Sequence, residues 1–197
     1  MIKEIENRRS IRKFSHKEIS EADIRDLLES GIKAPSAKNR QPWKFVVVMG
    51  EEKERMLEAF RRGIEREERG EALLPQSRQH LAGAKYTLQI MEQAPVSVFV
   101  LNSQGKDLFA PMNEEERIFE VCNIQSVSAA IQNMLLAAAE KGLGSLWICD
   151  IYFAYQELCS WLDMEGELLA AVSFGYPEEA PKERPRRALD EVTVWKK

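Results

Sequence analysis

The stretch that decides the fold is VSAAIQNMLLAAA, residues 127–139, because apolar or small side chains occupy nearly every face of it. It belongs to the longest regular pattern in the chain, which predicts a helix from about Glu115 to Lys141 with Gly142 as its C-cap. A helix without a polar face is usually buried on all sides. We therefore expect this segment at the centre of the domain or in an interface between subunits.

Short apolar runs on both sides of this helix predict strands at residues 45–49, 95–101, 145–148 and 168–174. Further helices are predicted from about Ile2, from Ser20 to about Ala34, and at 51–69, 86–91 and 152–162, with a loop or lid at 70–83. Ser20 has the pattern of an N-cap, with Asp23 in the first turn. Because helices separate the strands, we expect an α/β or α+β layered domain.

The composition narrows the class of protein. The chain has 197 residues, 44% hydrophobic and 30% charged, which predicts one domain spanning residues 1–197 or two small domains that share a core. The net charge of −4 argues against nucleic-acid binding through a basic face. No window approaches the roughly 18 apolar residues of a membrane span, and the first residues lack the apolar core of a signal peptide. We expect a cytoplasmic protein without membrane contact.

The three cysteines and two histidines show no metal-binding or disulfide spacing. Buried free thiols in a reducing compartment, and no metal, are therefore predicted.

Two basic clusters stand out in this acidic chain: Arg8-Arg9-Ser10-Ile11-Arg12, and the tail group of Lys182, Arg184, Arg186 and Arg187. Guanidinium groups match the geometry of phosphate, so the pair of clusters indicates an anion site. Two solvated charge runs are the alternative. The loop PSAKNRQPW at 35–43 adds Ser36, Asn39 and Gln41, which suit hydrogen bonding to a heteroaromatic ring better than acid–base catalysis.

The end of the chain changes character after Tyr176. Prolines and charges predict an extended segment over 176–197 that runs across a surface. Val192-Thr193-Val194-Trp195 is strand-like but has no nearby hairpin partner, so we expect it to complete a sheet elsewhere, in this chain or in another subunit.

Four segments in register closely resemble the nitroreductase family of FMN-dependent flavoproteins: RRSIRKF at 8–14, APSAKNRQPWKF at 34–45, GLGSLWI at 142–148 after the long helix, and GYP…RPRRALDEV at 175–192. The resemblance implies an α+β sandwich whose central, mostly antiparallel sheet is flanked by helices. It also implies an intertwined homodimer with FMN at the interface. The helix at 127–139 would then form the dimer core, 60–92 a lid or insertion, and 192–195 an arm on the partner's sheet.

The resemblance also implies roles for particular residues. Those at the FMN phosphate, ribityl chain and pyrimidine side would be Arg8, Arg9, Ser10 and Arg12. Arg184 and Arg186 match a phosphate-contacting pair, with Arg187 as a neighbouring alternative. The residues that reach the flavin of the other subunit would be Pro35, Ser36, Ala37 and Asn39. Ile148 and Cys149 would offer backbone groups near flavin N5, with Cys149 acting through its backbone rather than as a redox thiol.

The activity implied is an FMN-dependent oxidoreductase that passes hydride from NADH or NADPH to an oxidised small-molecule acceptor, such as a nitroaromatic or a quinone, in a ping-pong cycle. No side chain is expected to be catalytic, because the cofactor carries the chemistry. The alternatives are a flavin-dependent reductive dehalogenase or a flavin-fragmenting enzyme of the same fold, and a non-enzymatic FMN-binding sensor or storage protein.

Overall fold

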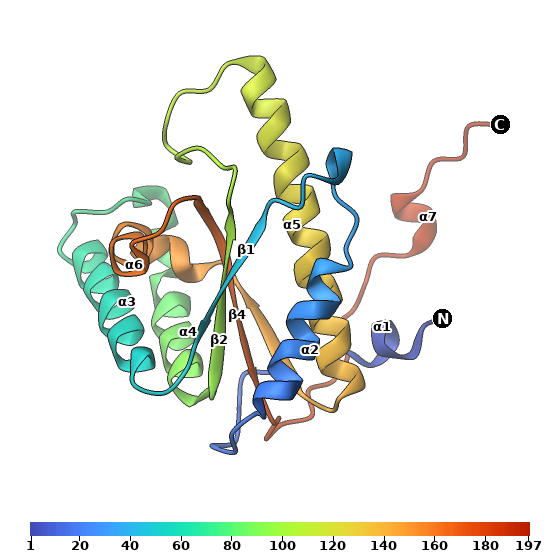
Figure 1. Cartoon of the computed structure of the whole chain (residues 1–197), viewed down its shortest axis with the longest axis horizontal. Coiled ribbons are helices and arrows are strands. Elements are labelled where there is room, and N and C mark those ends of the chain that lie inside the picture. Colours follow the sequence, from blue (N-terminus) through green and yellow to red (C-terminus); the bar gives the residue numbers. More distant parts are fainter.

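A computed structural model describes all 197 residues and places a four-stranded sheet at the centre of the chain (Figure 1). Its strands are β1 (Trp43–Val48), β2 (Val96–Asn102), β3 (Gly144–Ile148) and β4 (Glu167–Gly175). They lie in the order β1-β2-β4-β3, and every neighbouring pair is antiparallel. All four predicted strands and the antiparallel sheet are confirmed, with boundaries that differ by one or two residues.

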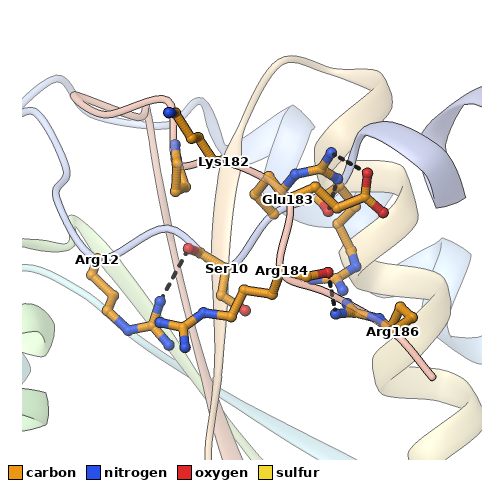
Figure 2. A pocket seen from close by; sticks show the side chains of 9 residues that line it. Ser10, Arg12, Lys182, Glu183, Arg184 and Arg186 are labelled. Carbon is orange, nitrogen blue, oxygen red and sulfur yellow. Dashed lines mark hydrogen bonds and ion pairs between the residues drawn. The ribbon is translucent and has the colours of Figure 1, made fainter.

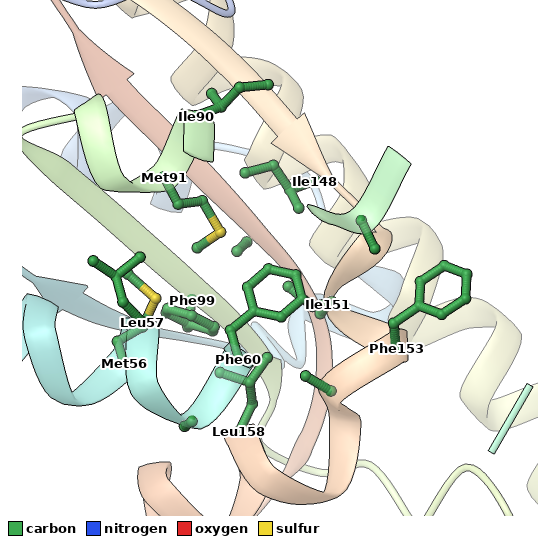
Figure 3. Packing of buried hydrophobic residues seen from close by; sticks show 14 of the residues in the cluster. Met56, Leu57, Phe60, Ile90, Met91, Phe99, Ile148, Ile151, Phe153 and Leu158 are labelled. Carbon is green, nitrogen blue, oxygen red and sulfur yellow. The ribbon is translucent and has the colours of Figure 1, made fainter. Parts of the chain in front are cut away.

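One helical layer covers the first face of the sheet. It consists of α3 (Glu52–Glu68), α4 (Leu81–Gln93), the 3-10 helix η3 (Asp150–Ala154) and α6 (Tyr155–Leu162). Figure 3 shows its core, in which Phe60 and Met91 pack toward the sheet residue Phe99. Successive residues of β2 point to opposite faces, so Phe99 joins this cluster while Val98 and Val100 join the other.

The second layer contains α2 (Glu21–Ile32) and α5 (Glu114–Glu140). Ser20 caps α2 as predicted, because its hydroxyl accepts a hydrogen bond from the backbone N–H of Asp23 at 3.1 Å. Helix α5 begins with a reciprocal capping box between Asn113 and Glu116. Gly142 follows α5 with φ of 70°, the left-handed conformation that a glycine adopts readily.

Within the single chain, the segment 127–139 is buried on one face only. Val127, Ile131 and Met134 pack against the sheet, whereas Leu136 and Ala137 are half-buried. One chain therefore does not bury this segment on all sides, and its place in an interface between subunits stays a prediction. Nearer the start of α5, apolar side chains are exposed: Ile118, Phe119, Val121 and Ile124.

The segment between α3 and α4 is shorter than predicted. Helix α4 begins at Leu81, not near Tyr86, because Leu81 and Ala84 are buried against the core and favour an earlier start. Only residues 69–80, including the 3-10 helix η2 (Pro75–His80), lie outside the two long helices. The role of residues 60–92 as a lid stays a prediction. The two ends of this segment lie in α3 and α4, which pack on the sheet.

The termini lie together on one side of the molecule (Figure 1). The N-terminus forms α1 (Lys3–Asn7), and residues 178–188 have no helix or strand before α7 (Leu189–Val192). The strand predicted at 192–195 is not formed: Val194 is 86% exposed and Trp195 is 73% exposed. A lone strand has no partner for its backbone groups, so the run stays irregular in one chain. No helix in the structure has the length and apolar character to cross a membrane.

Candidate functional site

The two basic clusters meet because the segments that carry them pair as antiparallel chains. The backbone N–H of Ser15 donates to the carbonyl of Tyr176 at 2.9 Å, and the N–H of Glu178 donates to the carbonyl of Lys13 at 2.9 Å. A carboxylate oxygen of Glu179 also accepts a hydrogen bond from the backbone N–H of Arg12. These contacts join parts of the chain more than 160 positions apart and fix the tail against the N-terminal segment.

The N-terminal segment is in turn fixed to the start of β3. Ser10 forms a parallel bridge with Ser145, and the N–H of Ile11 donates to the Ser145 carbonyl at 3.0 Å. A Cβ atom on Gly144 would lie 2.9 Å from three atoms of the Ile11 side chain, too close for any other residue without a shift. Glycine at 144 therefore permits this close approach.

Between the two segments lies a pocket of about 300 Å³ with no hydrophobic lining residue (Figure 2). Nine residues line it: Arg8, Arg9, Ser10, Arg12, Pro181, Lys182, Glu183, Arg184 and Arg186. The structure thus brings together all six N-terminal and tail residues that the sequence predicts at the phosphate. Arg187 does not line the pocket.

The pocket is strongly positive, because its lining has six cationic side chains and only one carboxylate. Burial, followed by the charges of Arg186 and Arg9, lowers the pKa of Arg8. The guanidinium groups of Arg9 and Arg186 donate mainly to backbone carbonyls, at 2.7 and 3.0 Å. The single carboxylate in the lining is that of Glu183, 3.7 Å from Arg9. Clustered guanidinium groups bonded to neutral acceptors make a site that favours an anion.

The loop 35–41 lies outside this pocket. It contains the 3-10 helix η1 (Ala37–Asn39), and three non-glycine residues, Lys38, Asn39 and Gln41, have φ near +50°. Strained backbone of this kind persists only where surrounding contacts hold it. Here the Ser36 hydroxyl accepts from the Gln41 N–H at 3.0 Å, and the N–H of Ala37 donates to the Ser126 hydroxyl at 3.2 Å. The loop that holds four predicted flavin-binding residues is thus bonded to α5 through Ala37, and it does not line the arginine pocket. These four residues are Pro35, Ser36, Ala37 and Asn39.

Ile148 and Cys149 lie at the opposite end of β3 from Ser145, about 10 Å along the strand. Ile148 is buried, and Cys149 is exposed. Desolvation of the thiol and the Asp150 carboxylate raise the pKa of Cys149, which keeps the sulfur protonated. All three cysteines are free as predicted, but none is fully buried: Cys122 and Cys159 are half-buried, and Cys149 is exposed, so the expectation of burial is wrong.

Several residues at or near the site are not assigned a role by the resemblance to the family. Lys182 belongs to the tail cluster but is not among the residues predicted at the phosphate, and Glu179 and Glu183 follow from pairing between distant segments. The hydroxyl of Thr87, a buried residue of α4, donates to the Asp150 carboxylate at 2.5 Å. No group of three His, Cys, Asp or Glu residues is placed to hold a metal ion.

Comparison with known proteins agrees with this architecture. The model of the nitroreductase family matches residues 5–176. The chain belongs to the nitroreductase family. It is an oxidoreductase of that family.

Individual relatives span nearly all of the nitroreductase chain. A candidate NADH dehydrogenase or NAD(P)H nitroreductase of Archaeoglobus fulgidus is 30% identical over 90% of this chain and 86% of its own. An iodotyrosine deiodinase of Thermotoga neapolitana is 28% identical over 92% and 91%. The crystal structure of a candidate nitroreductase from Desulfovibrio desulfuricans in complex with FMN has a TM-score of 0.73 and 27% identity, covering 100% of this chain and 96% of its own.

Proposed function

We propose that this chain binds FMN through the basic pocket and transfers hydride from NADH or NADPH to a small oxidised acceptor. The observation that carries the proposal is the pocket of six cations in a member of the nitroreductase family. A relative of 27% identity holds FMN in its crystal structure.

The residues present fit the phosphate of FMN. Burial, and then repulsion from the like charges of Arg186 and Arg9, lowers the pKa of Arg8, and an anion bound between the three guanidinium groups would offset both effects. Planar guanidinium groups can bond phosphate oxygens in pairs, which adds orientation to charge attraction. We assign Arg8, Arg9, Ser10, Arg12, Arg184 and Arg186 to the phosphate and its adjoining chain.

FMN, when bound, supplies the hydride chemistry. The part of this chain is to hold and orient the flavin and its reaction partners. We place the ring along β3, so that the backbone of Ile148 and Cys149 lies at its N5 edge. The raised pKa of Cys149 fits a residue that contributes its backbone, because a protonated thiol is a poor nucleophile. A positive charge beside the pyrimidine side would favour the negative charge of a reduced flavin.

A second copy of the chain completes the site in this proposal. The exposed apolar side chains Ile118, Phe119, Val121 and Ile124 of α5 would be covered in a homodimer. The outer edge of β1 has no neighbouring strand, so it offers backbone partners to residues 192–195 of the other copy. The loop with Pro35, Ser36, Ala37 and Asn39 would then reach the flavin of the partner.

For the acceptor we propose a nitroaromatic or a quinone, reduced after the oxidised donor has left, in a ping-pong cycle. The deiodinase relative at 28% identity supports a second candidate, reductive dehalogenation. Iodotyrosine and a nitroaromatic offered to the reduced protein under anaerobic conditions separate the two. Reoxidation of the flavin with iodide release supports dehalogenation, whereas reoxidation by the nitroaromatic alone supports the first candidate.

A bound flavin that neither NADH nor NADPH reduces would favour a sensor or storage role.

Arg8→Ala and Arg186→Ala test the phosphate assignment. Hydrogen bonds to a charged group contribute about 1.5–3 kcal/mol, so each variant should bind FMN roughly 10–100-fold more weakly. The measurement is flavin retained after dialysis, followed by titration of the apoprotein with FMN. Arg55→Ala, on the exposed surface of α3, is the matched control. Full FMN occupancy in both pocket variants would refute the assignment.

A further inference from the structure

The basic pocket holds more positive charge than one FMN phosphate neutralises. Its lining has six cationic side chains and one carboxylate, that of Glu183. A phosphate monoester carries a charge of about −1.5 to −2 at pH 7. About three positive charges would therefore remain uncompensated in the FMN-loaded protein, which points to a second anion at the same place.

The lining has two tiers that differ in exposure. Arg8, Arg9 and Arg12 are half-buried in the segment fixed to β3, so they form the floor. The tail residues Lys182, Arg184 and Arg186 are exposed and form the rim. A phosphate on the floor would leave part of the rim open to solvent.

Lys182 is the cation of the rim that the FMN assignment does not use. Its ammonium makes no hydrogen bond or ion pair in the structure, although Glu183 is its neighbour in sequence. Figure 2 shows Lys182 at the opposite edge of the pocket from Arg186. It is therefore a free positive charge beside the site of the flavin phosphate.

A molecule that visits the flavin during turnover is the source we consider for the second anion. The pyridine nucleotide donors do so, and NADPH differs from NADH by one phosphate monoester on the 2′ position of the adenosine ribose. We propose that Lys182 recognises this 2′-phosphate and makes the chain selective for NADPH. The inference rests on the proposed function, because it needs FMN on the floor of the pocket. Charge complementarity of this kind raises both specificity and the rate of encounter.

Binding of nucleotide fragments tests the recognition without any hydride transfer. The FMN-loaded protein is titrated calorimetrically with 2′,5′-ADP and with 5′-AMP, which lacks the 2′-phosphate. We expect 2′,5′-ADP to bind about tenfold more tightly to the natural protein, and Lys182→Gln to abolish most of this difference. Lys182→Arg should keep it. Lys33→Gln, at the exposed end of α2, removes the same charge away from the pocket and is the control.

Donor kinetics provide the second readout. The ratio of kcat/KM for NADPH to that for NADH should be about 10 for the natural protein and should fall several-fold in Lys182→Gln. Added salt should lower the NADPH value more steeply than the NADH value, because exposed charges are screened. The Lys33→Gln control should keep the natural ratio.

The inference fails if the natural protein treats the two donors alike, or if Lys182→Gln leaves both the donor ratio and 2′,5′-ADP binding unchanged. It also fails if Lys182→Gln loses FMN, or if FAD binds more tightly than FMN in a Lys182-dependent manner. Those results would assign Lys182 to the flavin nucleotide. The proposed function fails separately, if the protein takes up no FMN or if neither donor reduces the bound flavin.

Discussion

The two helical layers pack on the same sheet, but they differ on their outer surfaces. The outer surface of α3 carries ion pairs such as Arg55 with Glu52 and Arg61 with Glu58. The outer surface of α5 instead exposes Ile118, which is 65% accessible, and Val121. The first layer is complete within one chain, whereas the second presents an apolar surface of the kind that marks an interaction site. The layer with α3 therefore serves the folding of one chain, whereas we propose that the exposed face of α5 serves the assembly of two.

The largest expected effect lies in the complete layer. Phe60 of α3 is fully buried, so Phe60→Ala leaves a cavity and should lower the free energy of unfolding by about 3–5 kcal/mol. Ile118→Ala removes an exposed side chain of α5 and should change the stability of the monomer by less than about 0.5 kcal/mol. Urea unfolding at low protein concentration measures both. Equal losses would contradict the distinction between the layers.

A charge on the open layer should affect assembly instead. Val121→Asp places a carboxylate among the exposed apolar side chains of α5, and we expect it to weaken the proposed homodimer at least tenfold. Analytical ultracentrifugation over a range of concentrations measures the dissociation constant, with circular dichroism to verify the fold. Glu58→Gln on α3 serves as the control for a surface change. A natural protein that is monomeric throughout, or a variant that dimerises equally well, would refute this use of the surface.

The same division explains how much the sequence can predict. Local patterns locate the strands and the Ser20 cap because neighbouring residues determine them. The start of α4 is not predicted, since the pattern over 70–83, which ends at Gly83, indicates a loop. In the fold this glycine lies on an open helix surface, where a Cβ atom would meet no other group within 4 Å. Residues 193–195 form no strand within one chain although their sequence is strand-like, because pairing depends on a neighbouring strand that no local pattern reveals.

The candidate site is predictable only in part, for a related reason. Its arginines are visible as clusters, but the pocket exists because residues 12–15 pair with 176–179, a contact across almost the whole chain. The resemblance to a family, rather than any spacing rule, joins the two clusters. In the loop 35–41, the left-handed residues Lys38, Asn39 and Gln41 give no glycine signal, because contacts with α5 hold the backbone.

The smallest predicted effect concerns Glu167, at the boundary between the layers. Burial, together with the charges of Asp107 and Glu120, raises the pKa of this carboxyl despite hydrogen bonds from Tyr155 and Leu108. The folded state therefore binds a proton more readily than the unfolded state, so stability falls as the pH rises from about 4.3 toward the raised value. The slope is at most about 1.4 kcal/mol per pH unit.

Glu167→Gln should remove this part of the pH dependence while keeping an acceptor oxygen for Leu108. Urea midpoints between pH 4.5 and 7 measure the slope, and Glu165→Gln, on an exposed residue nearby, is the control. Parallel curves for the natural protein and Glu167→Gln would show that the carboxyl titrates alike in both states.

The loop between β2 and α5 owes its shape to residues outside itself. Glu120 accepts the backbone N–H of Lys106 at 3.0 Å, and Glu167 accepts that of Leu108 at 3.1 Å. Both carboxylates are nearly inaccessible, while the Leu108 side chain is exposed. Because these two bonds hold main-chain amides, a substitution of the exposed Leu108 side chain leaves them intact. Loss of either glutamate would instead release the backbone of the loop, so Glu120 and Glu167 are less replaceable than Leu108.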